Sequence, residues 1–189
     1  MENTSFYNYN ELSEFGFGSL GSNVLISRKA SIYTPHNIAI GDNVRVDDFC
    51  ILSGNVQMGS FIHISAYTAI FGGETGVYLD DYTTISSRCA IYAESDDYTG
   101  EYMTNPMLPD AFRGVIKGKV HISKHGIIGT GCTVLPGVTV GEGCSVGAMS
   151  LVNKSLFPWG VYVGIPCRLL RERKRELLQR EAEFEKMRK

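Results

Sequence analysis

Residues 120–153 read VHISKHGIIGTGCTVLPGVTVGEGCSVGAMSLVN, and this stretch decides the fold because an aliphatic residue falls at every sixth position. A period of 3.6 would scatter these residues around a helix, and a simple period of two would not place a turn-tolerant residue after each of them. The pattern predicts short strands separated by corners. One such unit cannot bury its apolar face alone, so the units are expected to stack into an all-β solenoid. The aliphatic residues are Ile122, Ile128, Val134, Val140, Val146 and Val152.

The same period extends upstream and then fails at one place. It runs from Ile26 to Ile91 with small shifts in phase, and it is absent from residues 94–119, which are rich in Asp, Gly, Pro and Asn. Long loops in compact folds are uncommon and often functional, so this segment is expected to project from the solenoid. We therefore divide the chain into an N-terminal cap (1–23), a solenoid with its loop (24–157), and an extended segment with a C-terminal helix (158–189). The charged helix is expected at residues 168–188.

The composition limits the classes of protein to which the chain can belong. The chain has 189 residues, 43% of them hydrophobic, and a net charge of −2, as expected for one main globular domain without a nucleic-acid partner. No apolar run reaches the length of a membrane span, and the N-terminus lacks the layout of a signal peptide, so a cytoplasmic location without membrane contact is expected. Four cysteines precede a large aliphatic residue by two positions and are predicted to be small core residues: Cys50, Cys89, Cys132 and Cys144.

The repeats and the segment after them resemble a known family. The hexads are similar to the left-handed parallel β-helix of the hexapeptide-repeat acyltransferases, and GVTVGEGCSVGAMSLVNKS (137–155) with PWGVYVGIPCR (158–168) resembles their coenzyme A-binding C-terminal coils. The resemblance implies an acyl-coenzyme A cosubstrate. No metal is expected, because the sequence contains no CxxC pair. The resemblance places contacts to the pantetheine arm and the next turn at Thr130, Ala148, Asn153 and Lys154, and contacts at the Gly-Ile-Pro element and the phosphates at Gly164, Pro166, Arg168 and Arg171.

The start of the long loop carries the main clue to the reaction. In galactoside and maltose O-acetyltransferases of this fold, a histidine at this place deprotonates a sugar hydroxyl, whereas the aligned residue here is Asp96 and the loop contains no histidine. A neutral amine is already nucleophilic and needs only a weak base to accept its proton. The aspartate therefore favours N-acylation over O-acylation. The alternative is that Asp96 and Asp97 are only turn residues.

A longer resemblance covers nearly the whole chain. Segments such as FYNYNEL (6–12), IGDNVRVDDFCILSG (40–54), HISAYTAIFGGE (63–74) and DDYTG (96–100) are similar, in order, to the N-acyltransferases of anthrose and viosamine biosynthesis. The resemblance implies transfer of an acyl group, expected to be acetyl, to the 4-amino group of a dTDP-linked 4-amino-4,6-dideoxy sugar used in surface glycan synthesis. It also implies a homotrimer with active sites between subunits.

The repeat register selects candidate residues for this reaction. Asp96 is the predicted base, Ser86 and His63 are predicted to position the reactants or stabilise the oxyanion, and Ser65, Glu74 and Asp97 are predicted to contact the substrate. Ser86 should lie one coil above Ser65. His63 and Asp96 should lie on different faces, so they would meet only across a subunit boundary.

Two other functions remain open from the residues alone. The first is a sugar O-acetyltransferase in which His63 or His125 replaces the missing histidine. The second is a non-catalytic β-helix scaffold. His121 and His125 are outward residues four apart, for which a surface role at a subunit groove is favoured over metal binding.

Overall fold

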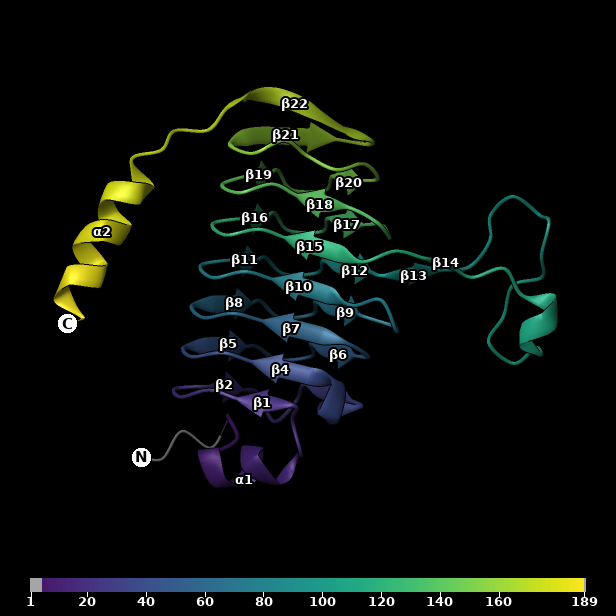
Figure 1. Cartoon of the computed structure of the whole chain (residues 1–189), viewed down its shortest axis with the longest axis horizontal. Helices are drawn as coiled ribbons and strands as arrows, with labels where there is room; N and C mark the ends of the chain where they lie inside the picture. Colours follow the sequence, from purple (N-terminus) through teal and green to yellow (C-terminus); the bar gives the residue numbers. More distant parts are fainter. Residues whose placement is uncertain (1–4, 189) are drawn as a thin grey trace.

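The computed structural model describes residues 5–188 and shows a three-sided parallel β-helix from which one long loop projects (Figure 1). Each strand pairs in parallel with the strand one turn later, as in the register His63 to Thr84 to Ile127. The predicted solenoid, projecting loop and C-terminal helix are confirmed. Residues 1–4 of the predicted cap and Lys189 lie outside the described residues.

The strands form three sheets, which we call faces 1, 2 and 3 in the order in which the chain visits them. Face 1 contains β1 (Ser19–Leu20), β4 (Ile38–Ile40), β7 (Val56–Met58), β10 (Val77–Leu79), β15 (Val120–Ile122) and β18 (Thr139–Val140). Face 2 contains β2 (Leu25–Ile26), β5 (Val44–Val46), β8 (Ile62–Ile64), β11 (Thr84–Ile85), β16 (Ile127–Ile128), β19 (Ser145–Val146), β21 (Gly160–Gly164) and β22 (Cys167–Glu172). Face 3 contains β3 (Ser31–Tyr33), β6 (Ile51–Ser53), β9 (Ala69–Phe71), β12 (Ala90–Tyr92), β17 (Thr133–Val134) and β20 (Leu151–Val152).

The core follows the six-residue period. The large aliphatic residues of face 2 form one buried column that runs parallel to the axis of the β-helix. The column consists of Ile26, Val46, Ile64, Ile85, Ile128 and Val146. Cys50, Cys89, Cys132 and Cys144 are also buried, which confirms their predicted core positions. Burial raises the pKa of the Cys89 thiol to about 11, so this group stays protonated at neutral pH.

The buried column gives the first testable expectation. Ile85 is fully buried between Ile64 and Ile128, so Ile85→Ala should lower the free energy of unfolding by about 2–5 kcal/mol, through lost burial and the cavity that remains. Urea unfolding followed by circular dichroism measures the change. The exposed Gln179→Ala on the C-terminal helix is the matched control and should change stability by less than about 0.5 kcal/mol. Equal midpoints for the two variants would contradict this account of the core.

Two corners of the three-sided coil matter for function. The chain passes from face 3 to face 1 through turns 34–37, 54–55, 72–76, 93–119, 135–138 and 153–155, which stack into what we call the loop corner. It passes from face 2 to face 3 through turns 27–30, 47–50, 65–68, 86–89, 129–132 and 147–150, which we call the serine corner after Ser65 and Ser86. Face 3 separates the two corners.

Both ends of the β-helix are covered. The short helix α1 (Tyr9–Glu14) begins with a capping box between Asn8 and Glu11 and buries Leu12 under the first turn. At the other end, β21 and β22 form an antiparallel hairpin on face 2 (Figure 1). No helix within residues 5–188 has both the length and the apolar character required to cross a membrane.

The boundary predicted for the C-terminal helix is wrong at its start. Cys167–Glu172 is a strand, and α2 (Leu177–Met187) begins nine residues later than the predicted position 168. The exposed edge of β21 offers unpaired backbone groups, and pairing with them outweighs the helix propensity of the Leu- and Arg-rich sequence. The chain then returns along face 2, where the Glu181 carboxylate contacts Lys124 and His125.

Candidate active site

The long loop leaves the loop corner as a two-stranded stem. Strands β13 (Glu94–Ser95) and β14 (Ile116–Lys117) pair in antiparallel fashion and hold residues 96–115 away from the coil (Figure 1). The turn below is tied to this stem by two contacts: the Glu74 backbone N–H donates to Glu94 Oε1 (2.8 Å), and Lys117 Nζ donates to Glu74 Oε2 (2.6 Å). The Lys117 ammonium lowers the pKa of Glu74. The base of the loop is therefore fixed to the coil.

A hollow of about 720 Å³ lies where the stem meets the coil. Its coil side consists of Tyr92, Leu135 and Pro136, and the loop contributes Asp96. Asn153 also lines it, so the structure brings the predicted base and one predicted coenzyme A contact to the same hollow. The Asp96 carboxylate is half-buried and has no hydrogen-bond partner within residues 5–188. It is available to accept a proton from a bound molecule.

The neighbouring Asp97 has a different role in the structure. Its carboxylate accepts hydrogen bonds from Thr99 N (2.9 Å), Thr99 Oγ1 (2.7 Å), Gly100 N (3.0 Å) and Tyr102 N (3.1 Å). The bonds from Thr99, followed by those from Tyr102 and Gly100, lower the pKa of Asp97 from 3.8 to about 2. Asp97 thus holds the first turn of the loop next to Asp96, and its predicted contact with substrate stays a prediction.

The first turn of the long loop should therefore depend on the Asp97 carboxylate for its order. Asp97→Asn should speed amide hydrogen exchange at Thr99, Gly100 and Tyr102, because a neutral carboxamide accepts their hydrogen bonds less strongly. The folded pKa is depressed, so in the wild type the protection should be complete above the ordinary pKa of 3.8 and be lost as the pH falls towards 2. Exchange measured by mass spectrometry checks both effects. Asp110→Asn, on the exposed part of the same loop, should leave the exchange of these amides unchanged, and equal exchange in both variants would contradict the assignment.

The serine corner carries a second group of predicted residues. Ser86 lies one turn above Ser65, as predicted from the register, and Thr130 and Ala148 follow in the next two turns as exposed residues. Gly164 is tied to this corner because its N–H donates to Ser150 Oγ (3.0 Å), and Pro166 follows in the turn between β21 and β22.

His63 lies on the outer surface of face 2. Its Nε2 is 2.8 Å from Asp47 Oδ2, and Arg45 Nε donates to the other oxygen of Asp47 (2.7 Å). Burial opposes ionisation of Asp47, but the hydrogen bonds from His63 and Arg45 outweigh it and lower the pKa of this carboxyl. His63 is thus held in place by Asp47 and is on a different face from Asp96.

No protein-family model matches the chain. It is 45% identical over 177 residues to the dTDP-4-amino-4,6-dideoxy-D-glucose acyltransferase of Escherichia coli, with 92% of each chain covered. The chain belongs to this acyltransferase family.

Solved structures agree with this membership. This chain matches the structure of AntD, an N-acyltransferase from Bacillus cereus in complex with dTDP and 3-hydroxybutyryl-CoA. The TM-score is 0.95, the identity is 51%, and 97% of both chains is covered. An AntD variant in complex with dTDP-4-amino-4,6-dideoxyglucose and coenzyme A matches with a TM-score of 0.96 and 50% identity. The acetyltransferase domain of PglB from Neisseria gonorrhoeae, at 18% identity and a TM-score of 0.60, shares only the fold.

A single chain of this acyltransferase does not bring all the predicted residues together. Asp96, Asp97, Glu74, Asn153 and Lys154 lie on the loop corner. Ser65, Ser86, Thr130, Ala148, Gly164 and Pro166 lie on or above the serine corner, beyond face 3. Of the residues predicted for catalysis, Asp96 lies on the loop corner, Ser86 on the serine corner and His63 on face 2.

The predicted phosphate contacts sit on the final strand. Arg168 and Arg171 belong to β22, opposite Val163 and Val161 of β21, and both are exposed. Arg168 lies next to the β21–β22 turn, whereas Arg171 lies towards the other end of the hairpin. Their role in this acyltransferase stays a prediction.

Two other histidines contact carboxylates. His121 Nε2 is 3.0 Å from Asp80 Oδ1, and His125 Nε2 is 2.9 Å from Glu181 Oε2 beneath α2. In the part of the chain that the structure describes, no three His, Cys, Asp or Glu side chains converge as a metal site would require.

Two residues in the wall of the hollow, Tyr92 and Leu135, were not predicted from the sequence. Like the predicted contact Asn153, each comes one residue after the large aliphatic residue of a face 3 strand, namely Ile91, Val134 and Val152. This position ends face 3 and begins the loop corner. Assigning each hexad to one of the three faces would have grouped these residues with Asp96.

Proposed function

We propose that this chain transfers an acyl group from acyl-coenzyme A to the 4-amino group of a dTDP-linked 4-amino-4,6-dideoxy sugar. The observation that carries the proposal is the free Asp96 carboxylate in a hollow lined by Asn153, in a chain 45% identical to an acyltransferase named for this acceptor. The sugar amine attacks the thioester carbonyl carbon, a C–N bond forms, and the C–S bond breaks. The amine proton passes to Asp96 and then to the departing thiolate, which leaves as free coenzyme A.

The spacing of two residues supports Ser86 and Asp96 as the pair at the reacting group. AntD has been crystallised with replacements at one aspartate and at one serine that are ten positions apart. In this chain, ten positions separate Ser86 from Asp96 and Ser87 from Asp97. Because Asp97 is fully engaged within its loop, the first pair fits better. Ser86 then donates to the thioester oxygen as negative charge develops there.

A homotrimer would complete the site. Ser86 and Asp96 lie on different corners of one chain, and the serine corner exposes large apolar side chains: Phe49 at 47%, Tyr67 at 56% and Met149 at 66%. Exposed apolar side chains gathered in one region are typical of an interface. We propose that the serine corner of one subunit faces the loop corner of the next, with Thr130, Ala148, Asn153, Lys154, Gly164, Pro166, Arg168 and Arg171 along the coenzyme A path. The predicted cytoplasmic location stays a prediction.

Comparing an acceptor that has an amine with one that has only hydroxyls tests the proposal. The purified protein with acetyl-coenzyme A should release free thiol in the presence of dTDP-4-amino-4,6-dideoxyglucose and not with dTDP-glucose, which offers only hydroxyls. Release with both would favour an O-acetyltransferase. That alternative is disfavoured by geometry, since His63 faces Asp47 on face 2 and His125 faces Glu181 under α2. A protein that neither binds coenzyme A in a thermal shift nor releases thiol would be a scaffold.

A further inference from the structure

The third corner of the coil lies beside the C-terminal helix. The chain passes from face 1 to face 2 through turns 21–24, 41–43, 59–61, 80–83, 123–126, 141–144 and 157–159, which we call the helix corner. The helix α2 descends from the top of the coil along this corner (yellow in Figure 1). Ser86 and Asp96, the residues proposed for the reaction, lie on the other two corners.

A column of stacked rings forms the coil side of the contact with α2. Phe61, Tyr82 and His125 occupy equivalent positions in three successive turns, with left-handed φ angles of 59°, 60° and 61°. The centre of the Tyr82 ring is 4.9 Å from that of Phe61 and 5.2 Å from that of His125, and the rings are nearly parallel. The next turn has Gly143 at this position, where a Cβ would meet the ring of Trp159. The column therefore ends at His125.

Two carboxylates of α2 hold the helix on this column. Glu181 Oε1 is 2.5 Å from Lys124 Nζ, and Glu181 Oε2 is 2.9 Å from His125 Nε2. One helical turn later, Glu185 accepts a hydrogen bond from the Tyr82 hydroxyl. Residues four apart lie on the same side of a helix, so both carboxylates face the coil.

Apolar packing adds little to this docking. No residue of α2 is buried, and Phe184, which packs edge-on against Phe61, remains 39% exposed. A hollow of about 480 Å³ lies between the helix and the coil. The helix has 11 residues and no side-chain cap at its N-terminus, and a helix of this length is marginal on its own in water. Its folding therefore depends on the two carboxylates.

The charge on each glutamate is favoured by its partners on the coil. Burial opposes ionisation of Glu181, but the hydrogen bonds from Lys124 and His125 outweigh it and lower the pKa of this carboxyl. The hydrogen bond from Tyr82 lowers the pKa of Glu185, while burial and this carboxylate raise the pKa of Tyr82 to about 12. The other charged groups nearby are Asp81 and Glu142 beside Lys124, Arg188 beside Glu185, Arg180 beside Glu183, and Arg173 at the hollow.

We infer that α2 is a strap that protons release: when Glu181 and Glu185 become neutral, the helix leaves the aromatic column and unfolds while the β-helix stays intact. The folded pKa of both carboxyls lies below the ordinary value of 4.5, so docking is complete above that value and is lost as the pH falls below it. Protonation of His125 adds a positive charge beside Glu181, so docking does not weaken between pH 7 and 5. Release uncovers Phe61 and Tyr82.

Hydrogen exchange of the intact protein, corrected for the chemical exchange rate at each pH, tests the inference. In the wild type, protection of residues 177–187 should stay constant from pH 7 to 5 and fall at least about tenfold between pH 5 and 3.5. Strand residues 62–64 and 84–85 should stay protected throughout. Glu181→Gln should lower the protection of α2 about 10- to 100-fold already at pH 7, because the ion pair with Lys124 is lost.

Glu183→Gln is the matched control for this experiment. It makes the same change on the same helix, but its carboxylate pairs with Arg180 of α2 itself, so protection should stay within about twofold of the wild type. Tyr82→Phe keeps the ring and removes the hydroxyl, and it should lower the protection of α2 several-fold at pH 7. The double variant Glu181→Gln/Glu185→Gln should show no further loss between pH 5 and 3.5.

Three results would overturn the strap. The first is equal protection of α2 in Glu181→Gln and Glu183→Gln. The second is loss of α2 protection at low pH only together with that of strands 62–64 and 84–85, which would be unfolding of the whole coil. The third is an α2 that is unprotected in the wild type at pH 7. None of these results bears on acyl transfer, which thiol release measures separately.

Discussion

Asp96→Asn is expected to lower kcat/KM for acyl transfer to the amino sugar by about 100- to 10,000-fold, the usual contribution of a positioned general base. The carboxamide keeps the size of the side chain but cannot accept the amine proton. Asp96 is suited to this test because its carboxylate makes no hydrogen bond within residues 5–188, so its replacement removes no structural contact of the described chain. The rate of thiol release at saturating acetyl-coenzyme A measures the effect.

Glu101→Gln is the matched control for this experiment. It makes the same change from carboxylate to carboxamide on an exposed residue of the same loop, and it should leave kcat/KM within about twofold of the wild type. If Asp96→Asn kept full activity across the pH range, another group would have to accept the proton. The thioester sulfur would then be the first group to consider.

Mixing two inactive variants is expected to restore activity. Ser86→Ala should lower kcat by about 100- to 1,000-fold if Ser86 stabilises the oxyanion, and Asp96→Asn disables the base. Because the two residues lie on corners separated by face 3, each site in the proposed trimer would take Ser86 from one subunit and Asp96 from its neighbour. Random co-assembly would leave about one quarter of the sites with both residues intact, so the mixture should reach about a quarter of wild-type activity.

Co-expression with two different affinity tags supplies the mixed oligomers. Tandem purification on both tags gives molecules that contain at least one subunit of each kind. Activity in these molecules no higher than in either variant alone would show that one chain holds the whole site. The double variant Ser86→Ala/Asp96→Asn, mixed with itself, is the inactive reference.

The hexad pattern was sufficient to predict the core, because each inward side chain in this fold is specified by its own six-residue unit. Ile85 and Cys89 could be placed inside from the neighbouring sequence alone. Residues 167–172 could not be placed in the same way. Their charged, leucine-containing sequence is compatible with a helix, and only the free edge of β21 selects a strand.

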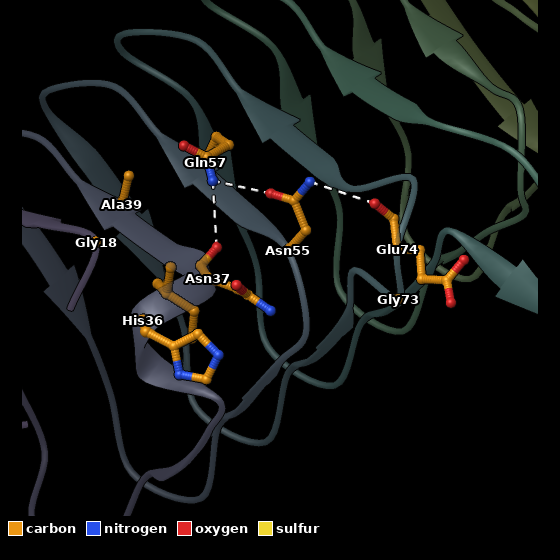
Figure 2. A pocket seen from close by; sticks show the side chains of 9 residues that line it. Gly18, His36, Asn37, Ala39, Asn55, Gln57, Gly73 and Glu74 are labelled. Carbon is orange, nitrogen blue, oxygen red and sulfur yellow. Dashed lines mark hydrogen bonds between the residues drawn. The ribbon is translucent and has the colours of Figure 1, made fainter. Parts of the chain in front are cut away.

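The candidate site was predictable in part for a similar reason. Asp96 could be located because it begins a segment in which the period fails, and Asp97 could have been identified as a loop-organising residue from the Thr-Gly that follows within three positions. A hollow on the loop corner below Asp96 is lined by Asn37, Gln57 and Glu74, which come from three successive turns (Figure 2). Its existence depends on side-chain length at stacked positions, and the repeat itself does not specify those lengths.

The terminal hairpin limits how far the stack of strands can grow. A parallel β-helix that simply stopped would present open strand edges to the next molecule, and end-to-end pairing of such edges would build fibres. Here β22 reverses direction and carries Arg168 and Arg171, while Arg173, just after it, donates to the carbonyls of His125, Gly143 and Cys144. The last edge is thus antiparallel and cationic. Molecules of this protein should repel one another at this end, so that a sequence built of self-pairing repeats stays dispersed at high concentration.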